Sequence, residues 1–249
     1  MKKPLIVNLN TINTKFYDLI AQEFSDSRKY NWQGWEKLLP LLRGLSTEKQ
    51  SLSVLDIGCG NGRFGMFLAE QLPDIKLTYT GIDNNQKLLS IAQTKLLSIN
   101  AAITFQQTDL VTDLIENTFL NNQNNFDLIV AFGVVHHIPS LELRTSFFSK
   151  LKNHLQPHGR AVITLWNFMA IARMQKKQSA FTDAQINTDE LEPNDYLLSW
   201  NRGTKAYRYC HFTDDDEQQQ LIDKSGLVLH KTYQADGKEG NGNTYLVLK

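Results

Sequence analysis

The feature that most constrains the fold of this chain is an apolar run that leads into a glycine-rich turn. Residues 54–62 read Val-Leu-Asp-Ile-Gly-Cys-Gly-Asn-Gly, which is typical of a buried strand followed by three closely spaced glycines. Glycine allows positive φ angles and a close approach of the backbone to a ligand. Residues 63–72 then carry apolar side chains at helical spacing and end before Pro73. The segment therefore predicts a strand, a ligand-binding turn and a helix.

The same alternation of strands and helices continues through the next hundred residues. The apolar patterns predict strands at 53–57, 77–83, 103–107, 126–132 and 160–166. They predict helices at 63–72, 86–99 and 141–155, the last one ended by a turn at 157–159. Strands that alternate with helices form a parallel sheet covered on both faces, and right-handed crossovers make it doubly wound.

Both ends of the chain extend this core. Apolar side chains at helical spacing predict two N-terminal helices at 13–24 and 33–43. Residues 167–207 are polar and break the rhythm, so we expect an irregular insertion over the ligand edge of the sheet. The tail predicts a helix at 214–224 and an antiparallel edge hairpin, whose two strands are at 227–234 and 244–248.

Composition sets only broad limits. Lys and Arg total 26 and Asp and Glu total 26, so a neutral chain has no overall attraction for a polyanion, although a local basic surface remains possible. The two cysteines, Cys59 and Cys210, lack metal-ligand spacing and indicate a reduced protein without a disulfide framework. No apolar run could span a bilayer and no signal peptide is recognisable. We expect a cytoplasmic protein with no membrane or DNA partner.

Three acidic residues stand at the ends of successive predicted strands. Asp56 precedes the glycines, where an acid suits a ligand with a positive amine better than a diphosphate. Asp83 lies about twenty residues further on, where a carboxylate can accept the hydroxyls of a ribose. Asp109 could accept the amine of adenine, with Leu110 packed on the base. Each acid could instead cap a turn or a helix.

The glycine spacing separates this turn from the dinucleotide fingerprint. In the fingerprint Gly-x-Gly-x-x-Gly, the third glycine would stand at position 63. Here the third glycine comes one residue earlier, and Arg63 stands at that position. S-adenosylmethionine (SAM) has an ammonium, a carboxylate and a sulfonium but no phosphate. Parallel sheets bind ligands at the carboxyl ends of their strands, where the three acids would converge. We predict a SAM site made of Asp56, Gly58, Cys59, Gly60, Gly62, Asp83, Asn84, Asp109, Leu110, Phe132 and Gly133.

The motifs VLDIGCGNGRF, GIDNN, QQTDL and FDLIVAFGVVHHI resemble the successive motifs of class I SAM-dependent methyltransferases. The resemblance covers residues 53–166 and implies a Rossmann-like α/β fold with N-terminal helices. Its sheet would be doubly wound, seven-stranded and mostly parallel, with an antiparallel last strand. We expect one methyltransferase domain in four segments: a helical cap (1–50), a SAM-binding core (51–166), an insertion with an acceptor-side motif (167–212), and a C-terminal helix and hairpin (213–249).

Two shorter motifs resemble the tRNA wobble-uridine carboxymethyl methyltransferases, which are similar to the methyltransferase half of AlkB-type tRNA hydroxylase fusions. YDLIAQEFS at 17–25, followed by Arg28 and Trp32, resembles their IA-x-x-FS-x-(T/S)R segment. YRYCHF at 207–212 resembles their RYYH motif, with Cys210 in place of the second Tyr. The resemblance implies tRNA as partner and methylation of 5-carboxymethyluridine. Eukaryotic members of that family work with a small zinc-binding activator protein, on which this sequence gives no information.

The acceptor chemistry suggests further residues. A carboxylate is already ionised near neutral pH, so its methylation needs a cationic grip and no general base. Arg208 offers a planar fork, and Arg28 could meet the same anion. Tyr209 and His211 could orient the acceptor or stack on its base. One histidine of the His136-His137 pair could line the pocket. We predict the acceptor-side residues to be Arg28, His136, Arg208, Tyr209 and His211.

Several alternatives stay open. Adjacent residues of a strand point in opposite directions, so we expect no metal between His136 and His137. Trp166 could line the pocket, but without homology a core position is favoured, and Cys59 is interpreted as a space-filling residue. One basic cluster could contact phosphates, but acids in the same insertion favour a solvated mixed surface; the cluster is Arg173, Lys176, Lys177, Arg202, Lys205 and Arg208. A small-molecule methyltransferase, for example for a quinone precursor, and a non-catalytic SAM-binding module are the competing functions.

Overall fold

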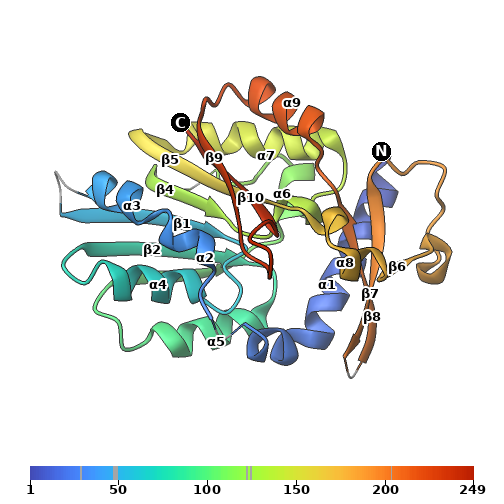
Figure 1. The fold of residues 1–249 in the computed structure, drawn as a ribbon, viewed down its shortest axis with the longest axis horizontal. Helices are drawn as coiled ribbons and strands as arrows, with labels where there is room; N and C mark the ends of the chain where they lie inside the picture. The colour runs from blue at the N-terminus through green and yellow to red at the C-terminus, as the bar shows by residue number, and fades with distance from the viewer. Residues whose placement is uncertain (29, 47–49, 122, 124, 203) are drawn as a thin grey trace.

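The computed structural model describes residues 1–28, 30–46, 50–121, 123, 125–202 and 204–249. In this part of the chain a seven-stranded sheet has the order β3-β2-β1-β4-β5-β10-β9 (Figure 1). Its strands are β1 (Ser51–Ile57), β2 (Lys76–Asp83), β3 (Ala102–Gln107), β4 (Phe126–Ala131), β5 (Leu155–Trp166), β9 (Leu229–Ala235) and β10 (Asn243–Leu248). The first five pair in parallel, and β10 is antiparallel to β5 and β9. The predicted doubly wound sheet with an antiparallel last strand is confirmed.

Helices cover both faces of this sheet, because the side chains of each buried strand alternate between the two faces. Leu55 and Ile57 of β1 belong to the cluster that packs on one set of helices: α6 (Leu110–Ile115), α7 (Leu141–Asn153) and α9 (Asp215–Ser225). Leu52 and Val54 belong to the cluster on the other set: α2 (Gln33–Glu36), α3 (Leu39–Ser46), α4 (Arg63–Gln71) and α5 (Gln86–Leu96).

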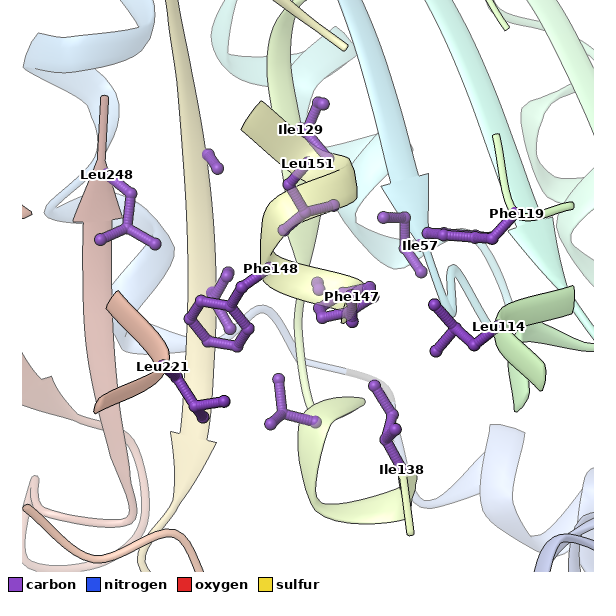
Figure 2. Packing of buried hydrophobic residues seen from close by; sticks show 14 of the residues in the cluster. Ile57, Leu114, Phe119, Ile129, Ile138, Phe147, Phe148, Leu151, Leu221 and Leu248 are labelled. Atoms are coloured by element: carbon purple, nitrogen blue, oxygen red, sulfur yellow. The ribbon is translucent and has the colours of Figure 1, made fainter. Parts of the chain in front are cut away.

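The first of these clusters fixes α7 and α9 on the sheet (Figure 2). Phe147 and Phe148 of α7 and Leu221 of α9 are fully buried, and they pack in one cluster with Ile129 of β4 and Leu248 of β10. Each such side chain contributes about 1.5–3 kcal/mol when it is fully buried. The two helices are therefore a firm support for side chains that they carry at the ligand edge.

The N-terminal helices differ from the sequence-based expectation. Helix α1 (Lys3–Asp26) begins ten residues before the predicted start at 13, because Pro4 suits its first turn and Leu5 and Leu9 extend its buried stripe. The single helix predicted at 33–43 is wrong. This segment forms two helices, α2 and α3, because Pro40 lacks an N–H and is tolerated only in the first turn of a helix. Helix α6 was not predicted.

The predicted turn at 157–159 is also wrong, because β5 runs through it. Phe126 of β4 lies opposite Leu155, but Leu128 lies opposite Arg160, so the pairing between the strands shifts within this stretch. An irregularity of this kind accommodates a proline and a glycine inside a strand. Among the described residues, no helix is long and apolar enough to cross a membrane.

The insertion after β5 has regular secondary structure, so the prediction of an irregular segment is wrong. It forms a second sheet with the order β6-β7-β8, in which both pairings are antiparallel. Helix α1 packs directly on β8 of this sheet (Figure 1). The insertion also contains one short helix and two 3₁₀ turns, and a further turn follows β4. These elements are β6 (Gln178–Ser179), β7 (Asp195–Arg202), β8 (Thr204–His211), α8 (Ala172–Gln175), η1 (Val135–His137), η2 (Phe168–Ala170) and η3 (Phe181–Ala184).

Asn85 joins α5 to α1. Its side-chain oxygen caps α5 by accepting the Leu88 N–H at 3.0 Å, and its amide donates to Asp18 of α1 at 2.8 Å. Asn85→Ala is expected to lower the free energy of unfolding by about 1–2 kcal/mol, as loss of an N-cap does. Urea denaturation measures this change. Ser90→Ala, on the exposed side of the same helix, is the matched control, and an equal loss in both variants would contradict the prediction.

Candidate active site

The turn between β1 and α4 carries the three glycines with positive φ angles. Gly58, Gly60 and Gly62 have φ values of 67°, 54° and 76°. A Cβ on Gly58 would lie 2.5 Å from Val134, whereas at Gly60 the nearest atom would be 3.9 Å away, on Phe24. Gly60 therefore leaves space in front of the backbone. At Gly62 a Cβ would lie 2.7 Å from the Leu96 side chain of α5.

Two adjoining cavities lie beside this turn, at the carboxyl ends of the parallel strands. We call one the acidic cavity, about 150 Å³, because Asp83 and Asp109 line it. The other, about 260 Å³, is the aromatic cavity, which is lined by Trp32, Trp35, Trp166 and Trp200. Together they fall within the range of about 300–1,000 Å³ that is usual for small-molecule sites. The residues that line both are Tyr17, Phe24, Gly58, Gly60, Phe132 and Gly133.

Most of the predicted cofactor residues line one of these cavities. Asn84 and Leu110 line the acidic cavity, and Asp56 and Cys59 line the aromatic cavity. Gly62 is the exception, since the described lining of neither cavity includes it. Its expected role in the ligand site is therefore not supported. Its conformation and its close packing against α5 are sufficient reason for a glycine there.

Asp83 ties the end of β2 to the glycine turn. One carboxylate oxygen accepts the N–H of Gly60 at 2.9 Å, and the other accepts the N–H of Asn85 at 2.9 Å. Burial raises the pKa of Asp83, although these backbone N–H groups act in the opposite direction. A carboxylate offers about four acceptor positions, so Asp83 can still accept hydrogen bonds from a ligand in the acidic cavity.

Asp109 caps α6 and also contacts α1. It accepts the N–H groups of Val111 and Thr112 at 3.1 Å, and the amide of Asn10 lies 3.0 and 2.9 Å from its two oxygens. Helix capping, the alternative role that the sequence analysis kept for Asp109, is thus present. The same side chain also lines the acidic cavity. Asn10, Asn13 and Tyr17 show that α1 covers the acidic cavity, which the sequence analysis did not anticipate.

Asp56 is a buried carboxyl group at the edge of the aromatic cavity. It accepts a hydrogen bond of 2.5 Å from the hydroxyl of Tyr79. Burial raises the pKa of Asp56 to about 7, although this bond and the charge of Arg63 counteract it. Burial likewise raises the pKa of the neighbouring Cys59 thiol. Cys59 is therefore not a thiolate at neutral pH.

The raised pKa of Asp56 makes binding of a cationic amine depend on pH. Such a ligand favours the ionised carboxylate, so its binding should release a proton below about pH 7, and its affinity should rise as the pH passes through that value. Calorimetry with SAM in buffers of different ionisation enthalpy measures the released proton. Asp56→Asn should abolish the release, and an affinity independent of pH in the unmodified protein would contradict the assignment.

The aromatic cavity is strongly cationic. Its described lining contains five cationic side chains and one carboxylate, that of Asp56: Arg28, Arg63, Arg173, Lys177 and Arg208 are the cations. Burial lowers the pKa of Arg63 to about 10, so its side chain still carries a positive charge at neutral pH. A planar anion fits this lining of rings and charges.

Arg208 extends from β8 into the aromatic cavity. Its guanidinium lies 4.7 Å from the ring centre of Trp166 and 5.3 Å from that of Phe16. Trp166 is therefore a wall of the cavity, and the core position favoured by the sequence is wrong. The solvated surface predicted for the insertion is wrong for Arg173 and Lys177, which line the cavity. The side chain of Arg202 lies outside the described residues.

His136 and His137 lie in the turn η1 and not in a strand, so the expectation that they point apart is wrong. Their ring centres are 4.1 Å apart. His136 lines the aromatic cavity, and its buried Nδ1 has no hydrogen-bond partner among the described residues. Burial lowers the pKa of both rings, that of His137 to about 3, and the charge of Arg208 adds to the effect. Both histidines are therefore neutral at neutral pH.

Cys210 lies beside the two histidines. Ligand atoms of His136, His137 and Cys210 lie within 4.8 Å of one another. Both ring nitrogens of His137 are engaged, Nε2 with the hydroxyl of Tyr17 at 2.9 Å and Nδ1 with a backbone carbonyl at 3.0 Å. The nearby guanidinium of Arg208 also disfavours a cation. That the chain binds no metal stays a prediction.

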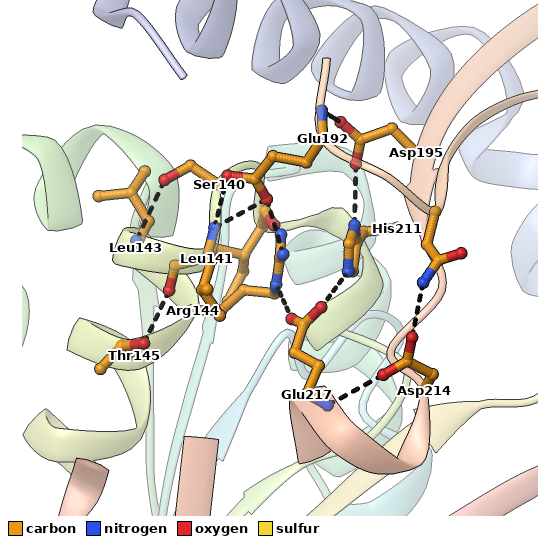
Figure 3. Close-up of polar contacts among 12 residues, drawn as sticks. Ser140, Leu141, Leu143, Arg144, Thr145, Glu192, Asp195, His211, Asp214 and Glu217 are labelled. Carbon is orange, nitrogen blue, oxygen red and sulfur yellow. Dashed lines mark hydrogen bonds and ion pairs between the residues drawn. The ribbon is translucent and has the colours of Figure 1, made fainter. Parts of the chain in front are cut away.

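Tyr209 and His211 do not line either cavity as described, so their predicted contact with an acceptor is wrong. Successive side chains of a strand face opposite sides, and Arg208 takes the cavity side of β8. The hydroxyl of Tyr209 donates to Asp195 at 2.6 Å, and His211 lies between Asp195 and Glu217 (Figure 3). The sequence analysis did not reveal these partners, because only folding brings Asp195 and Glu217 to the two ring nitrogens of His211.

Comparison with known proteins identifies the type of reaction. A family model described as a methyltransferase domain matches residues 55–161, the part of the chain with the glycine turn and the three acids. The chain is a SAM-dependent methyltransferase, and it resembles the class I enzymes. SAM is therefore its cofactor, and the open space at Gly60 and the carboxylates of the acidic cavity fit a molecule with hydroxyl and amine donors.

Relatives of the enzyme differ in length and in name. It is 26% identical over 215 residues to a candidate methyltransferase of Encephalitozoon cuniculi, covering 86% of each chain. It is 25% identical over 180 residues to the ubiquinone biosynthesis O-methyltransferase of Bartonella tribocorum, covering 72% of this chain and 61% of that one. It is 26% identical over 162 residues to the tRNA (carboxymethyluridine(34)-5-O)-methyltransferase ALKBH8 of Mus musculus, covering 65% of this chain and 21% of that one.

The fold also resembles solved structures. A SAM-dependent methyltransferase from Clostridium acetobutylicum superposes with a TM-score of 0.65 at 14% identity, covering 94% of this chain and 97% of that chain. At this level of identity the comparison supports the fold alone. It agrees with the Rossmann-like fold described above.

Proposed function

We propose that the enzyme methylates the carboxylate of 5-carboxymethyluridine at the wobble position of tRNA. The observation that carries this proposal is the position of Arg208 in a cationic, aromatic cavity that adjoins the acidic cavity. A carboxylate acceptor needs a charged fork and no general base, and both histidines at this edge are neutral. The rings of Trp166 and Trp200 offer stacking surfaces for a base.

On the cofactor side, we assign the acidic cavity to the adenosine of SAM. Asp83 would accept the ribose hydroxyls, and Asp109 the adenine amine, with Leu110 against the base. Asp56 would face the ammonium group. SAM supplies a methyl group on a cationic sulfur. The task of the protein is to hold the acceptor oxygen about 3 Å from that methyl group and in line with the sulfur.

The shared residues support this division of the two cavities. Gly58, Gly60 and Gly133 lie where the acidic and the aromatic cavity meet, and Phe132 lies beside them. A cofactor that occupies the acidic cavity would reach the acceptor there. Arg28, whose guanidinium lies 4.8 Å from the ring centre of Phe24, would be a second cation for the acceptor anion. His136 would line the acceptor side as a neutral group.

The names of the relatives support the choice of acceptor unequally. The similarity to mouse ALKBH8, which is named for carboxymethyluridine, favours tRNA as the partner. The similarity to the ubiquinone biosynthesis enzyme keeps a small aromatic acceptor as the competing function. Action on tRNA agrees with the cytoplasmic location expected from the sequence. Nothing in the described residues supports a zinc-binding activator partner.

The test is methyl transfer from isotopically labelled SAM to purified tRNA that carries 5-carboxymethyluridine. We expect nucleoside mass spectrometry to detect its methyl ester. The same tRNA transcribed without modification is the matched control and should stay unlabelled. Transfer to a quinone precursor but not to tRNA would overturn the proposal in favour of a small-molecule enzyme. SAM binding without transfer to any acceptor would favour a non-catalytic module.

A further inference from the structure

A buried ion network surrounds His211 at the end of β8 (Figure 3). His211 and Arg208 are three residues apart on this strand, so their side chains face opposite sides of it. His211 contacts Asp195 at 2.8 Å through Nδ1 and Glu217 at 2.7 Å through Nε2. Arg144 donates to Glu217 at 2.6 Å and to Glu192 at 2.9 Å. The side chains of His211 and Arg144 are 1% and 0% exposed, so water contributes little to these contacts.

The buried ion network connects the second sheet to the core of the domain. Arg144 lies on α7 and Glu217 on α9, the two helices that the core holds against the main sheet (Figure 2). Asp195 begins β7 and His211 ends β8, and the two residues face each other in the ladder. Glu192, just before β7, also accepts the backbone N–H of Leu141 at the start of α7. The strands are thus anchored through His211.

The same network reaches the residue next to Arg208. Asp195 Oδ1, which contacts His211, also accepts the hydroxyl of Tyr209. The backbone N–H of Tyr209 donates to Asn13 of α1 at 2.8 Å, and its carbonyl accepts from His137 at 3.0 Å. Tyr209 is therefore held at its side chain and at both backbone groups. A displaced β8 would move the neighbouring Arg208 relative to the aromatic cavity.

The charges of the network favour a protonated ring. Burial by itself lowers the pKa of His211, but the hydrogen bonds to Asp195 and Glu217 outweigh it and raise the pKa above its usual 6.5. The other titratable groups nearby are Arg144, Glu192, Tyr209 and Asp214, the N-cap of α9. A neutral imidazole has one N–H, so it would leave one of its two carboxylates without this donor. A buried carboxylate that loses its donor is strongly destabilising.

We propose that His211 is a positioning residue, whose protonated ring clamps β8 to α9 and thereby aims Arg208 into the aromatic cavity. The part that concerns Arg208 rests on the proposed function. Because the pKa of His211 is raised in the folded protein, the clamp is complete below about pH 6.5 and is lost as the pH rises through the raised value. The affinity for the acceptor should fall over that range, and SAM affinity should not.

The first test measures KM and kcat for the tRNA acceptor against pH. In the unmodified enzyme we expect KM to rise about tenfold as His211 loses its proton, with little change in kcat. In His211→Gln, KM should be high at all pH values. Glu217→Gln should move the transition to lower pH, because one of the charges that raise the pKa is removed. His158→Gln, an exposed histidine, is the control.

The second test needs no acceptor, so its failure is distinguishable from failure of the proposed function. Hydrogen-exchange protection factors of β7 and β8, corrected for the intrinsic rate, should fall with rising pH in the unmodified enzyme and be low throughout in His211→Gln. Protection in α4 and β1 should not change. Protection of β7 and β8 that is independent of pH in the unmodified enzyme, or an unchanged profile in His211→Gln, would overturn the proposal.

Discussion

Arg208→Ala is expected to lower kcat/KM for the acceptor by about 10²- to 10³-fold and to leave SAM affinity unchanged. The guanidinium lies over Trp166 in the aromatic cavity, where it would pair with the acceptor carboxylate. Without it, an anion partly removed from water would lose its bidentate partner. Steady-state kinetics with modified tRNA measures the first quantity, and calorimetry with SAM measures the second.

Two further variants separate charge from geometry. Arg208→Lys keeps the charge but loses the planar fork, so its kcat/KM should fall between those of the unmodified enzyme and the alanine variant. Lys205→Ala, on the same strand but exposed and outside the described lining of the cavity, is the matched control. Unchanged turnover of Arg208→Ala would remove Arg208 from the acceptor site.

Asp83→Asn is expected to weaken SAM binding by about 10²-fold. The two oxygens of Asp83 accept the N–H groups of Gly60 and Asn85 and would also accept ribose hydroxyls. An amide has only one oxygen, so its NH₂ group would face one of these N–H donors. Each hydrogen bond to a charged group contributes about 1.5–3 kcal/mol, and the glycine turn would lose its attachment to β2 as well.

Calorimetric titration with SAM tests this second variant. Asp74→Asn, in the exposed turn before β2, changes the same functional group away from the site and should bind SAM normally. The melting temperature without SAM shows whether Asp83→Asn is folded. A folded Asp83→Asn variant with full SAM affinity would exclude Asp83 from the cofactor site.

The parts of the fold that the sequence predicted depend on short-range patterns. The apolar runs at β1 and β4 are buried strands. Helix α4 begins after the glycine turn and ends before Pro73, as the conformations that glycine and proline allow predict. The acids at 56, 83 and 109 lie around two adjoining cavities at one edge of the sheet, because parallel strands place their carboxyl ends there. Each of these inferences needs only neighbouring residues and the rule for parallel sheets.

The errors arose where the local backbone departs from a strand or where another segment decides the outcome. His136 and His137 lie in a 3₁₀ turn, so the strand rule for side-chain directions did not apply to them. Tyr209 and His211 face a network supplied by α7, α9 and β7, and not the aromatic cavity. The polar composition of the insertion concealed a second sheet, because two of its supports, helix α1 and Arg144 of α7, are distant in sequence.

The sequence by itself determined the doubly wound core and the glycine turn, since these follow from local periodicity, and the acids at strand ends together with the resemblance to known methyltransferases predicted the cofactor. Only the tertiary structure decided which face of β8 lines the aromatic cavity, that α1 covers the acidic cavity, and that His211 is buried between two carboxylates. The physical reason is that burial, charge pairing and side-chain direction depend on elements brought together by folding, and a linear pattern does not specify those neighbours.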